Sequence, residues 1–295
     1  MNNVLIVGAN GLIGSNLVRH FDNKKESQTK IFTADTHGDV DLIVSPSSCE
    51  KYMNFMTKHR ISKVINLAAI SSEQRCLDSP ELVQWQNVEF PCVLFGELKG
   101  VSKETLFVHA STEWIYGDKA LVTDSLPASK LDSSGLGLYA SSKLFSERRL
   151  CDLASSANRL AILRLGIVYS LSDNGCNSFV NKAFEAASNG EYFVCKSGNS
   201  ARRYVSMSQV CSAFERSVSA KFDGSISIEN VQGPELLKNG DVLEKIKLVK
   251  PDFRFEVETS SVNSSVRDIL NTFSDHSVDS ENFQLDGQLK AAIRL

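Results

Sequence analysis

Long hydrophobic runs are missing from this sequence of 295 residues. A membrane-spanning helix needs about 20 consecutive apolar residues, whereas the longest apolar runs here, Val4–Val7 and Val64–Ile70, have the length of a strand. No cationic segment precedes the first run, so we expect no secretory signal and no membrane partner.

A dominant charge and a regular cysteine pattern are also missing. The 32 basic and 35 acidic residues give a formal net charge of −3. Because proteins that bind nucleic acid usually carry a basic excess, we expect no nucleic-acid partner. The seven cysteines are odd in number and include no CxxC pair. They argue against a disulfide framework or a metal site and favour a reducing, cytoplasmic location.

Apolar runs of strand length alternate with helical segments through the first half of the chain. The expected strands are Val4–Val7, Lys30–Ala34, Asp41–Val44, Lys63–Ala68, Leu106–Ala110 and Arg159–Leu165. The expected helices are Leu12–Phe21, Ser47–Arg60, Glu81–Leu98 with a kink at Pro91, and Tyr139–Ser155. Strands that alternate with helices indicate βαβ units. The sequence therefore predicts an α/β protein with a Rossmann-type doubly wound parallel sheet.

Three glycines, Gly8, Gly11 and Gly14, lie between the first expected strand and the first expected helix. Glycine permits a tight turn and a close approach to a pyrophosphate, and the N–H groups at a helix start attract phosphate. This position makes a plain glycine-rich turn the weaker interpretation. The residues expected to bind a dinucleotide are Gly8, Asn10, Gly11, Leu12, Ile13 and Gly14.

Asp35 ends the second expected strand, about 20 residues past the glycines. A carboxylate at this place accepts hydrogen bonds from the adenosine ribose. It would repel the 2′-phosphate of NADP, and no arginine follows it in residues 36–38. The sequence therefore favours NAD as the cofactor, and the alternative role for Asp35 is to cap a turn.

The alternation of strands and helices changes after about Gly166, where loops rich in Asn, Ser and Gly separate shorter elements. We therefore expect two lobes. Residues 1–165 would form the NAD-binding lobe, to which residues 204–225 return. Residues 166–203 and 226–295 would form a smaller C-terminal α/β lobe that binds substrate.

A Tyr-x-x-x-Lys spacing occurs twice, at Tyr139/Lys143 and at Tyr192/Lys196. The first pair lies in an expected helix, where residues four apart share a face. A nearby ammonium would lower the pKa of the Tyr139 phenol toward the range of a general acid/base. The second pair lies in an expected strand, where residues four apart are separated by about 13 Å, so we expect no coupling there.

Ser111 and Thr112 follow the expected strand Leu106–Ala110 at its carboxyl end, where doubly wound sheets bind their ligands. Either hydroxyl could hydrogen-bond the substrate oxygen that changes oxidation state. A local turn is the alternative role for such a pair. We prefer the substrate role because the glycine turn and the Tyr139/Lys143 pair are also present.

In their order and spacing, these segments resemble the extended short-chain dehydrogenase/reductase family, also called the NAD-dependent epimerase/dehydratase family. The matching segments are Gly8–Gly14 (GxxGxxG), Asn66–Ala69 (HLAA), Asn87–Val88 (NV), Ser111–Gly117 (S-S/T-x-x-V-Y-G), Tyr139–Lys143 (YxxSK), Leu163–Tyr169 (LRxxNVYG), Arg202–Val205 (RDFI) and Ile226–Gly233 (YNIGxG). Together they span most of the chain.

The resemblance implies a nucleotide-sugar substrate and hydride exchange with NAD at a sugar carbon, usually C4. The catalytic residues would be Thr112, Tyr139 and Lys143. Tyr139 would be the general acid/base, Thr112 would orient the substrate oxygen, and Lys143 would bind the nicotinamide ribose and tune Tyr139. Ser111 would also contact the substrate. The residues beside the cofactor would be Leu67, Ala68, Ala69 and Asn87. Arg202 would pair with the substrate diphosphate, because a guanidinium fork suits phosphate oxygens; a solvated loop charge is the alternative.

Several positions depart from the family pattern. Dehydratases of the family carry an acidic pair after the Thr, and the second place here is Trp114, which cannot transfer a proton. We therefore do not expect a dehydratase. Ile167 replaces a substrate-contacting Asn, and Arg203 replaces an Asp and adds positive charge near the expected diphosphate. Ser45 replaces the Asp before the adenine pocket, a role that Asp41 could take.

Two reactions remain open. One is an epimerase that keeps its NAD, and the other is a deoxysugar 4-ketoreductase, similar to dTDP-4-dehydrorhamnose reductase, that releases oxidised cofactor at each turnover. Epimerisation is slightly favoured because Arg202 and Asp35 fit its pattern. A non-catalytic dinucleotide sensor is disfavoured because the acid/base pair is present. Members of the family often form homodimers through two long helices, here Glu81–Leu98 and Tyr139–Ser155, and the sequence leaves this open.

Overall fold

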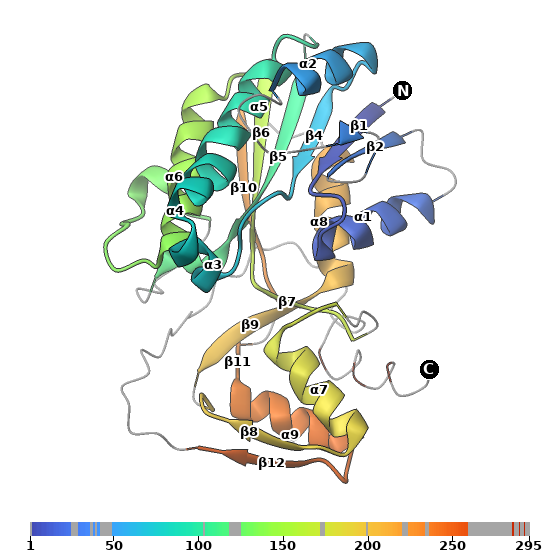
Figure 1. Cartoon of the computed structure of the whole chain (residues 1–295), viewed down its shortest axis with the longest axis vertical. Coiled ribbons are helices and arrows are strands. Elements are labelled where there is room, and N and C mark those ends of the chain that lie inside the picture. Colours follow the sequence, from blue (N-terminus) through green and yellow to red (C-terminus); the bar gives the residue numbers. More distant parts are fainter. Residues whose placement is uncertain are drawn as a thin grey trace. The chain divides into compact units, whose positions relative to one another are not determined.

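The structure is a computed structural model. It describes residues 2–24, 29–35, 38, 40–41, 49–102, 104–117, 125–171, 175–198, 200–219, 224–233, 236–258, 285, 289 and 292. The chain divides into two compact units (Figure 1). Unit 1 comprises Met1–Ile115, Leu126–Arg164 and Cys211–Glu229, and unit 2 comprises Tyr116–Ser125, Leu165–Val210 and Asn230–Leu295. The chain thus returns to unit 1 at Cys211, whereas the sequence suggested residue 204.

Unit 1 is built on a seven-stranded sheet in the order β10-β6-β5-β4-β1-β2-β3. The strands are β1 (Asn2–Val7), β2 (Thr29–Asp35), β3 (Val40–Asp41), β4 (Lys63–Asn66), β5 (Thr105–Thr112), β6 (Asn158–Leu165) and β10 (Ile226–Val231). Strand β1 pairs in parallel with β2 and β4, and β4 pairs in parallel with β5. The predicted doubly wound sheet is confirmed. Strand order reverses at β1, and the carboxyl ends of the strands there form the ligand-binding edge of such sheets.

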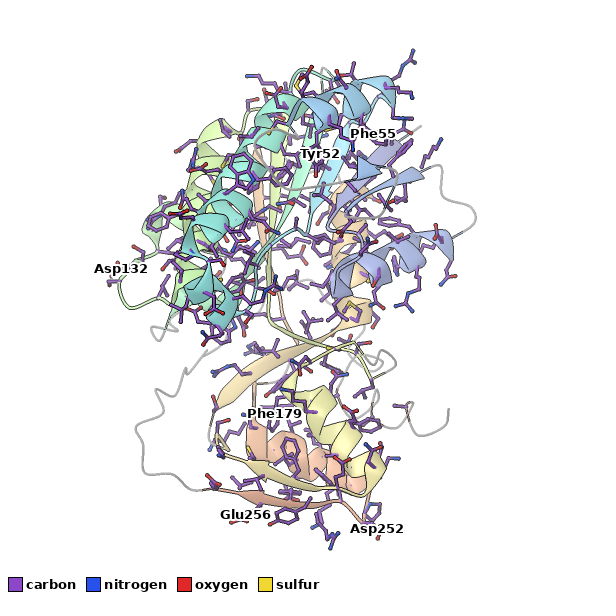
Figure 2. The ribbon with its side chains drawn as sticks, viewed as in Figure 1. Tyr52, Phe55, Asp132, Phe179, Asp252 and Glu256 are labelled. Atoms are coloured by element: carbon purple, nitrogen blue, oxygen red, sulfur yellow. The ribbon has the colours of Figure 1, made fainter. Side chains whose placement is uncertain are left out.

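Helices cover both faces of this sheet (Figure 1). One face carries α1 (Leu12–Asp22) and α8 (Met207–Ser219), and the other carries α2 (Cys49–Lys58), α5 (Phe90–Leu98) and α6 (Leu138–Leu153). Strand β5 is buried at all eight positions, as expected for a strand that is covered on both sides. Tyr52 and Phe55 extend from α2 (Figure 2), and the Tyr52 ring packs against Phe90 with ring centroids 5.4 Å apart.

The predicted kink near Pro91 takes the form of a π-helix. The segment Glu81–Leu98 is divided into α4 (Pro80–Val83), the π-helix η2 (Gln84–Glu89) and α5. Proline lacks an N–H group, and its ring clashes with the carbonyl four residues earlier, here that of Asn87. The π turn lies directly before Pro91, and its residue Asn87 is fully buried.

The described part of unit 2 contains two small sheets and two main helices. The sheets have the orders β11 (Leu236–Lys238), β9 (Ala201–Ser206), β7 (Ile167–Tyr169) and β12 (Arg254–Val257), β8 (Tyr192–Cys195). The helices are α7 (Phe179–Asn189) and α9 (Asn239–Val249). Phe179 begins α7 (Figure 2), and its ring contacts that of Phe193 edge-on at 5.7 Å. Within the described parts of both units, no helix is long and apolar enough to cross a membrane.

Candidate active site

The glycine segment forms a tight turn between β1 and α1. Gly8 has a φ of +84°, and a Cβ there would lie 2.8 Å from the backbone nitrogen of Ala68. The turn therefore lies directly against the segment after β4. A Cβ on Gly14 would lie 2.1 Å from the carbonyl oxygen of Gly8. Only glycine at position 14 lets α1 pack this closely on the turn.

The start of α1 and the end of β2 lie beside this turn. Gly11 precedes α1 and offers no side-chain cap, and the first turn of α1 has no acidic residue, so its positive end remains available to an anion. Asp35 Oδ2 accepts a hydrogen bond of 2.8 Å from the backbone nitrogen of Asn10. The two features fit a dinucleotide, whose pyrophosphate would lie at α1 and whose ribose would lie at Asp35.

Asn87, which we expected beside the cofactor, is held by the protein itself. Its Oδ1 accepts from the Ile70 nitrogen at 2.8 Å, and its Nδ2 donates to the Ile70 carbonyl at 2.9 Å and to Ser142 Oγ at 3.0 Å. The π turn directs this amide inward. Asn87 therefore joins the segment after β4 to α6.

The three residues that we expected to perform the chemistry meet at the carboxyl end of β5. Thr112 is the last residue of β5, and its side chain lies close enough to the Tyr139 phenol to influence the pKa of that phenol. Lys143 Nζ donates a hydrogen bond of 2.8 Å to the carbonyl oxygen of Ala110, two residues before Thr112. A hydroxyl, a phenol and an ammonium therefore lie at the ligand-binding edge of the sheet.

Burial controls the pKa values of these groups. Burial raises the pKa of Tyr139 to about 12; Cys76 adds to the rise and the Thr112 side chain opposes it. Burial lowers the pKa of Lys143 to about 8, and Glu147 and Cys76 oppose this effect. The expectation that Lys143 lowers the Tyr139 pKa is therefore wrong for the protein alone, because desolvation of the phenol is the larger effect.

A buried network behind this edge was missed by the sequence analysis. Ser111 Oγ donates to Glu147 Oε1 at 2.5 Å, and Glu147 forms an ion pair of 2.6 Å with Arg164. Ser111 was expected to contact substrate, but its buried hydroxyl is used by Glu147. The spacing Tyr139, Lys143, Glu147 was an available signal, because residues four apart share a helix face.

Arg202 and Arg203 lie on β9 in unit 2. Arg202 is half-buried. Arg203 is 4% exposed, and its Nη1 donates to the carbonyl of Gly233 at 3.2 Å. Arg203 is therefore a buried charge on β9, and its place near a substrate diphosphate stays a prediction. Ile167 lies on β7, and Ser45 lies outside the described residues.

The second Tyr-x-x-x-Lys spacing lies in a strand as far as Cys195, as predicted, and Lys196 follows in a turn. Tyr192 begins β8, is exposed, and donates its hydroxyl to Glu256 Oε2 at 3.0 Å. Glu256 belongs to β12 (Figure 2). The contacts of Tyr192 are thus those of a surface strand pair.

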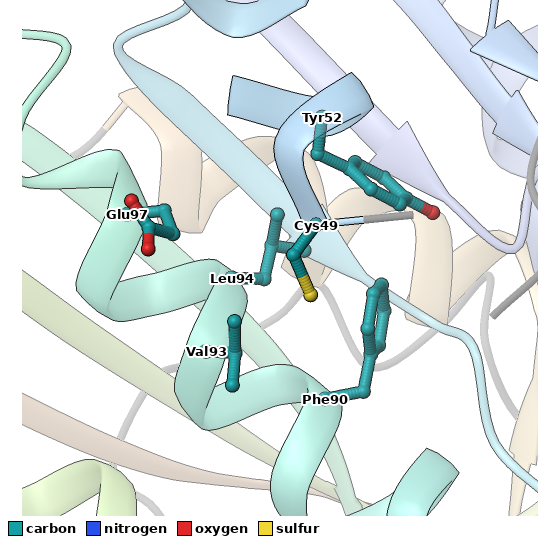
Figure 3. A pocket seen from close by; sticks show the side chains of 6 residues that line it. All are labelled: Cys49, Tyr52, Phe90, Val93, Leu94 and Glu97. Atoms are coloured by element: carbon teal, nitrogen blue, oxygen red, sulfur yellow. The ribbon is translucent and has the colours of Figure 1, made fainter. Parts of the chain in front are cut away.

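A shallow pocket lies between α2 and α5 (Figure 3). Its lining residues are Cys49, Tyr52, Phe90, Val93, Leu94 and Glu97. None of the expected site residues lines this pocket. The Tyr52 hydroxyl points away from Cys49 and Leu94 (Figure 3). We interpret the pocket as a packing gap. Among the described residues, no cluster of His, Cys, Asp or Glu could hold a metal ion.

The sequence matches one protein-family model over residues 4–227, which is more than half of the chain. That model describes the NAD-dependent epimerase/dehydratase family. The chain belongs to this family. No curated protein matches the sequence.

Solved structures of three different enzymes share the fold. UDP-glucose 4-epimerase of Thermotoga maritima, solved with UDP-glucose, has a TM-score of 0.76 at 19% identity and covers 99% of this chain and 97% of its own. A dTDP-4-dehydrorhamnose reductase of Clostridium acetobutylicum has a TM-score of 0.70 at 18% identity, and the match covers 88% of this chain and 84% of the reductase. A dTDP-glucose 4,6-dehydratase of Bacillus anthracis, solved with NAD, has a TM-score of 0.69 at 18% identity, and the match covers 88% of this chain and 85% of the dehydratase. The likeness establishes the fold, on which the family performs several reactions.

Proposed function

We propose that this chain is an NAD-dependent enzyme that changes the oxidation state of one carbon, C4, of a nucleotide sugar. The observation that carries the proposal is the placement of Thr112, Tyr139 and Lys143 together at the carboxyl end of β5, where Lys143 Nζ donates to the carbonyl oxygen of Ala110 at 2.8 Å. These are the groups needed for proton transfer at a substrate oxygen. Family membership supports NAD as cofactor. The UDP and dTDP sugars named for similar structures support the substrate class.

Each residue has one task in this reaction. Bound NAD would supply the acceptor and donor for the hydride of the sugar carbon, with the turn Gly8–Gly14 and Asp35 as its holders. Tyr139 exchanges a proton with the oxygen on that carbon, and the Thr112 hydroxyl orients this oxygen. Because its pKa is raised to about 12, Tyr139 is neutral at pH 7, which is the form that donates a proton to a ketone. Lys143 would bind the nicotinamide ribose.

Epimerisation is the first reaction to test and 4-ketoreduction is the second. Trp114 cannot transfer a proton, which argues against the dehydratase reaction. Arg202 and Asp35 fit the epimerase pattern, which supports this order.

The test is turnover of UDP-glucose by the purified protein without added cofactor, with chromatographic separation of the UDP-hexoses. An epimerase turns over with the NAD that it retains. A strict requirement for stoichiometric NADH and a 4-ketosugar would identify the reductase instead.

A pair of matched variants tests the role of Tyr139. Tyr139→Phe should lower kcat by about 10²–10⁴-fold while NAD binding survives. Tyr192→Phe removes the exposed phenol of the other Tyr-x-x-x-Lys spacing and should keep full activity. Full activity in Tyr139→Phe would contradict the mechanism.

A further inference from the structure

The helix that carries Tyr139 and Lys143 has no cap of its own. Its N-cap residue is Gly137, which makes no side-chain hydrogen bond. Glu73, 65 residues before Leu138, takes this role from helix α3 (Glu73–Asp78). Glu73 Oε1 accepts from the Leu138 nitrogen at 2.6 Å, and Oε2 accepts from the Tyr139 nitrogen at 3.2 Å. One carboxylate therefore satisfies the first two N–H groups of α6.

Gly137 makes room for this carboxylate. Its φ of −64° and ψ of 166° are open to any residue, so the backbone does not require glycine. A Cβ at this position, however, would lie 2.7 Å from Glu73 Oε1 and 3.0 Å from Glu73 Cδ. A side chain at position 137 would therefore displace the Glu73 carboxylate from its place at α6.

Helix α3 is itself anchored beside the phenol. Its Cys76 is buried, and the thiol donates to the carbonyl of Ile70 at 3.5 Å. Cys76, Ile70 and Val83 form a buried cluster, against which Leu138 and Tyr139 pack. Because α3 is held in this way, a bond from α3 to the first turn of α6 can hold that turn in place.

We propose that Glu73 is a positioning residue for Tyr139: its carboxylate caps α6 from α3, fixes the first turn of α6, and so sets the phenol against Thr112. The inference rests on the proposed function of Tyr139. The N–H groups of a first helical turn have no partner within the helix, and a negative charge there is favourable. A small displacement matters, since misplacing a catalytic group by about 1 Å can lower a rate by about 100-fold.

Two different substitutions should break the cap. Glu73→Ala removes the carboxylate, and Gly137→Ala displaces it with a methyl group. Each should lower kcat by about tenfold or more with KM little changed, and each should speed hydrogen exchange at the amides of Leu138 and Tyr139. The double variant should be no worse than either single variant, because both remove the same contact. The control is Glu50→Ala, which removes an exposed glutamate from the first turn of α2 and should change neither quantity.

A local cap should rescue the defect. Gly137→Ser in the Glu73→Ala background supplies a preferred N-cap side chain at a suitable extended backbone. We expect kcat and amide protection to return together. Unchanged kcat in Glu73→Ala, or protected amides without recovery of kcat in the rescued variant, would overturn the positioning role. Hydrogen exchange reports the cap without any substrate, and full activity in Tyr139→Phe would separately identify a failure of the proposed function.

Discussion

Arg164 and Glu147 form an ion pair at 2.6 Å in which neither side chain is exposed to solvent. Arg164 Nη1 also donates to the carbonyl of Leu126 at 2.7 Å, and Glu147 also accepts from Ser111. A buried pair is tolerated only when such additional hydrogen bonds are present. The pair lies one helical turn beyond Lys143, so it supports the helix that carries the acid/base.

Breaking this pair should destabilise the protein. Glu147→Gln leaves the Arg164 guanidinium buried without a counter-charge, and we expect the free energy of unfolding to fall by about 3–5 kcal/mol. Urea unfolding followed by circular dichroism measures this loss. The control is Glu229→Gln, whose partner Arg216 lies at 2.8 Å but is 46% exposed. There we expect less than about 1 kcal/mol, and equal losses in both variants would contradict the prediction.

Removing the Thr112 hydroxyl should shift the pH dependence of the reaction. The Thr112 side chain opposes the rise of the Tyr139 pKa, so Thr112→Val should raise that pKa further. The half-reaction in which the phenolate acts as a base should then require a higher pH in the variant than in the wild type. Thr112→Ser keeps the hydroxyl and should retain the wild-type profile of kcat against pH. If Thr112→Val shows the same dependence of kcat on pH as the wild type, the Thr112 hydroxyl does not influence the Tyr139 phenol.

Titration of Lys143 should appear in the stability of the protein. Burial lowers its pKa from 10.5 to about 8. Between pH 8 and 10.5 the unfolded chain therefore binds more protons at this residue than the folded chain does. The free energy of unfolding therefore increases as the pH rises through this range. Lys143→Met removes the titrating group and therefore this contribution to the pH dependence of stability. The free energy of unfolding of the wild type, relative to that of the variant, should increase by on the order of 3 kcal/mol between pH 8 and 10.5. A difference independent of pH in urea unfolding would refute this.

The glycine turn should tolerate no side chain at Gly14. Gly14→Ala places a Cβ 2.1 Å from the carbonyl oxygen of Gly8, so α1 must move away from the turn. We expect NAD affinity to fall by about tenfold or more, equivalent to about 1.4 kcal/mol, in a calorimetric titration. Gly96→Ala in α5 meets no atom within 4 Å and is the control. It should keep NAD affinity and stabilise the helix by about 0.5–1 kcal/mol.

The alternation of strands and helices was predictable because it depends on local periodicity. Strand β5 shows this, since its apolar run indicated a strand and the structure extends it only by a few residues. The segment Glu81–Leu98 shows the limit. Pro91 indicated a break, but the π turn and the inward position of Asn87 depend on how the segment packs against α6.

The sequence by itself determined the Rossmann-type order of elements, the glycine turn and the helical spacing of Tyr139 and Lys143. These are relations between residues that lie close together in the chain. Only the tertiary structure decided that Ser111 binds Glu147 and that Glu73 caps α6. It also decided the direction of the Tyr139 pKa shift, because burial and partners from distant segments set the environment of each group.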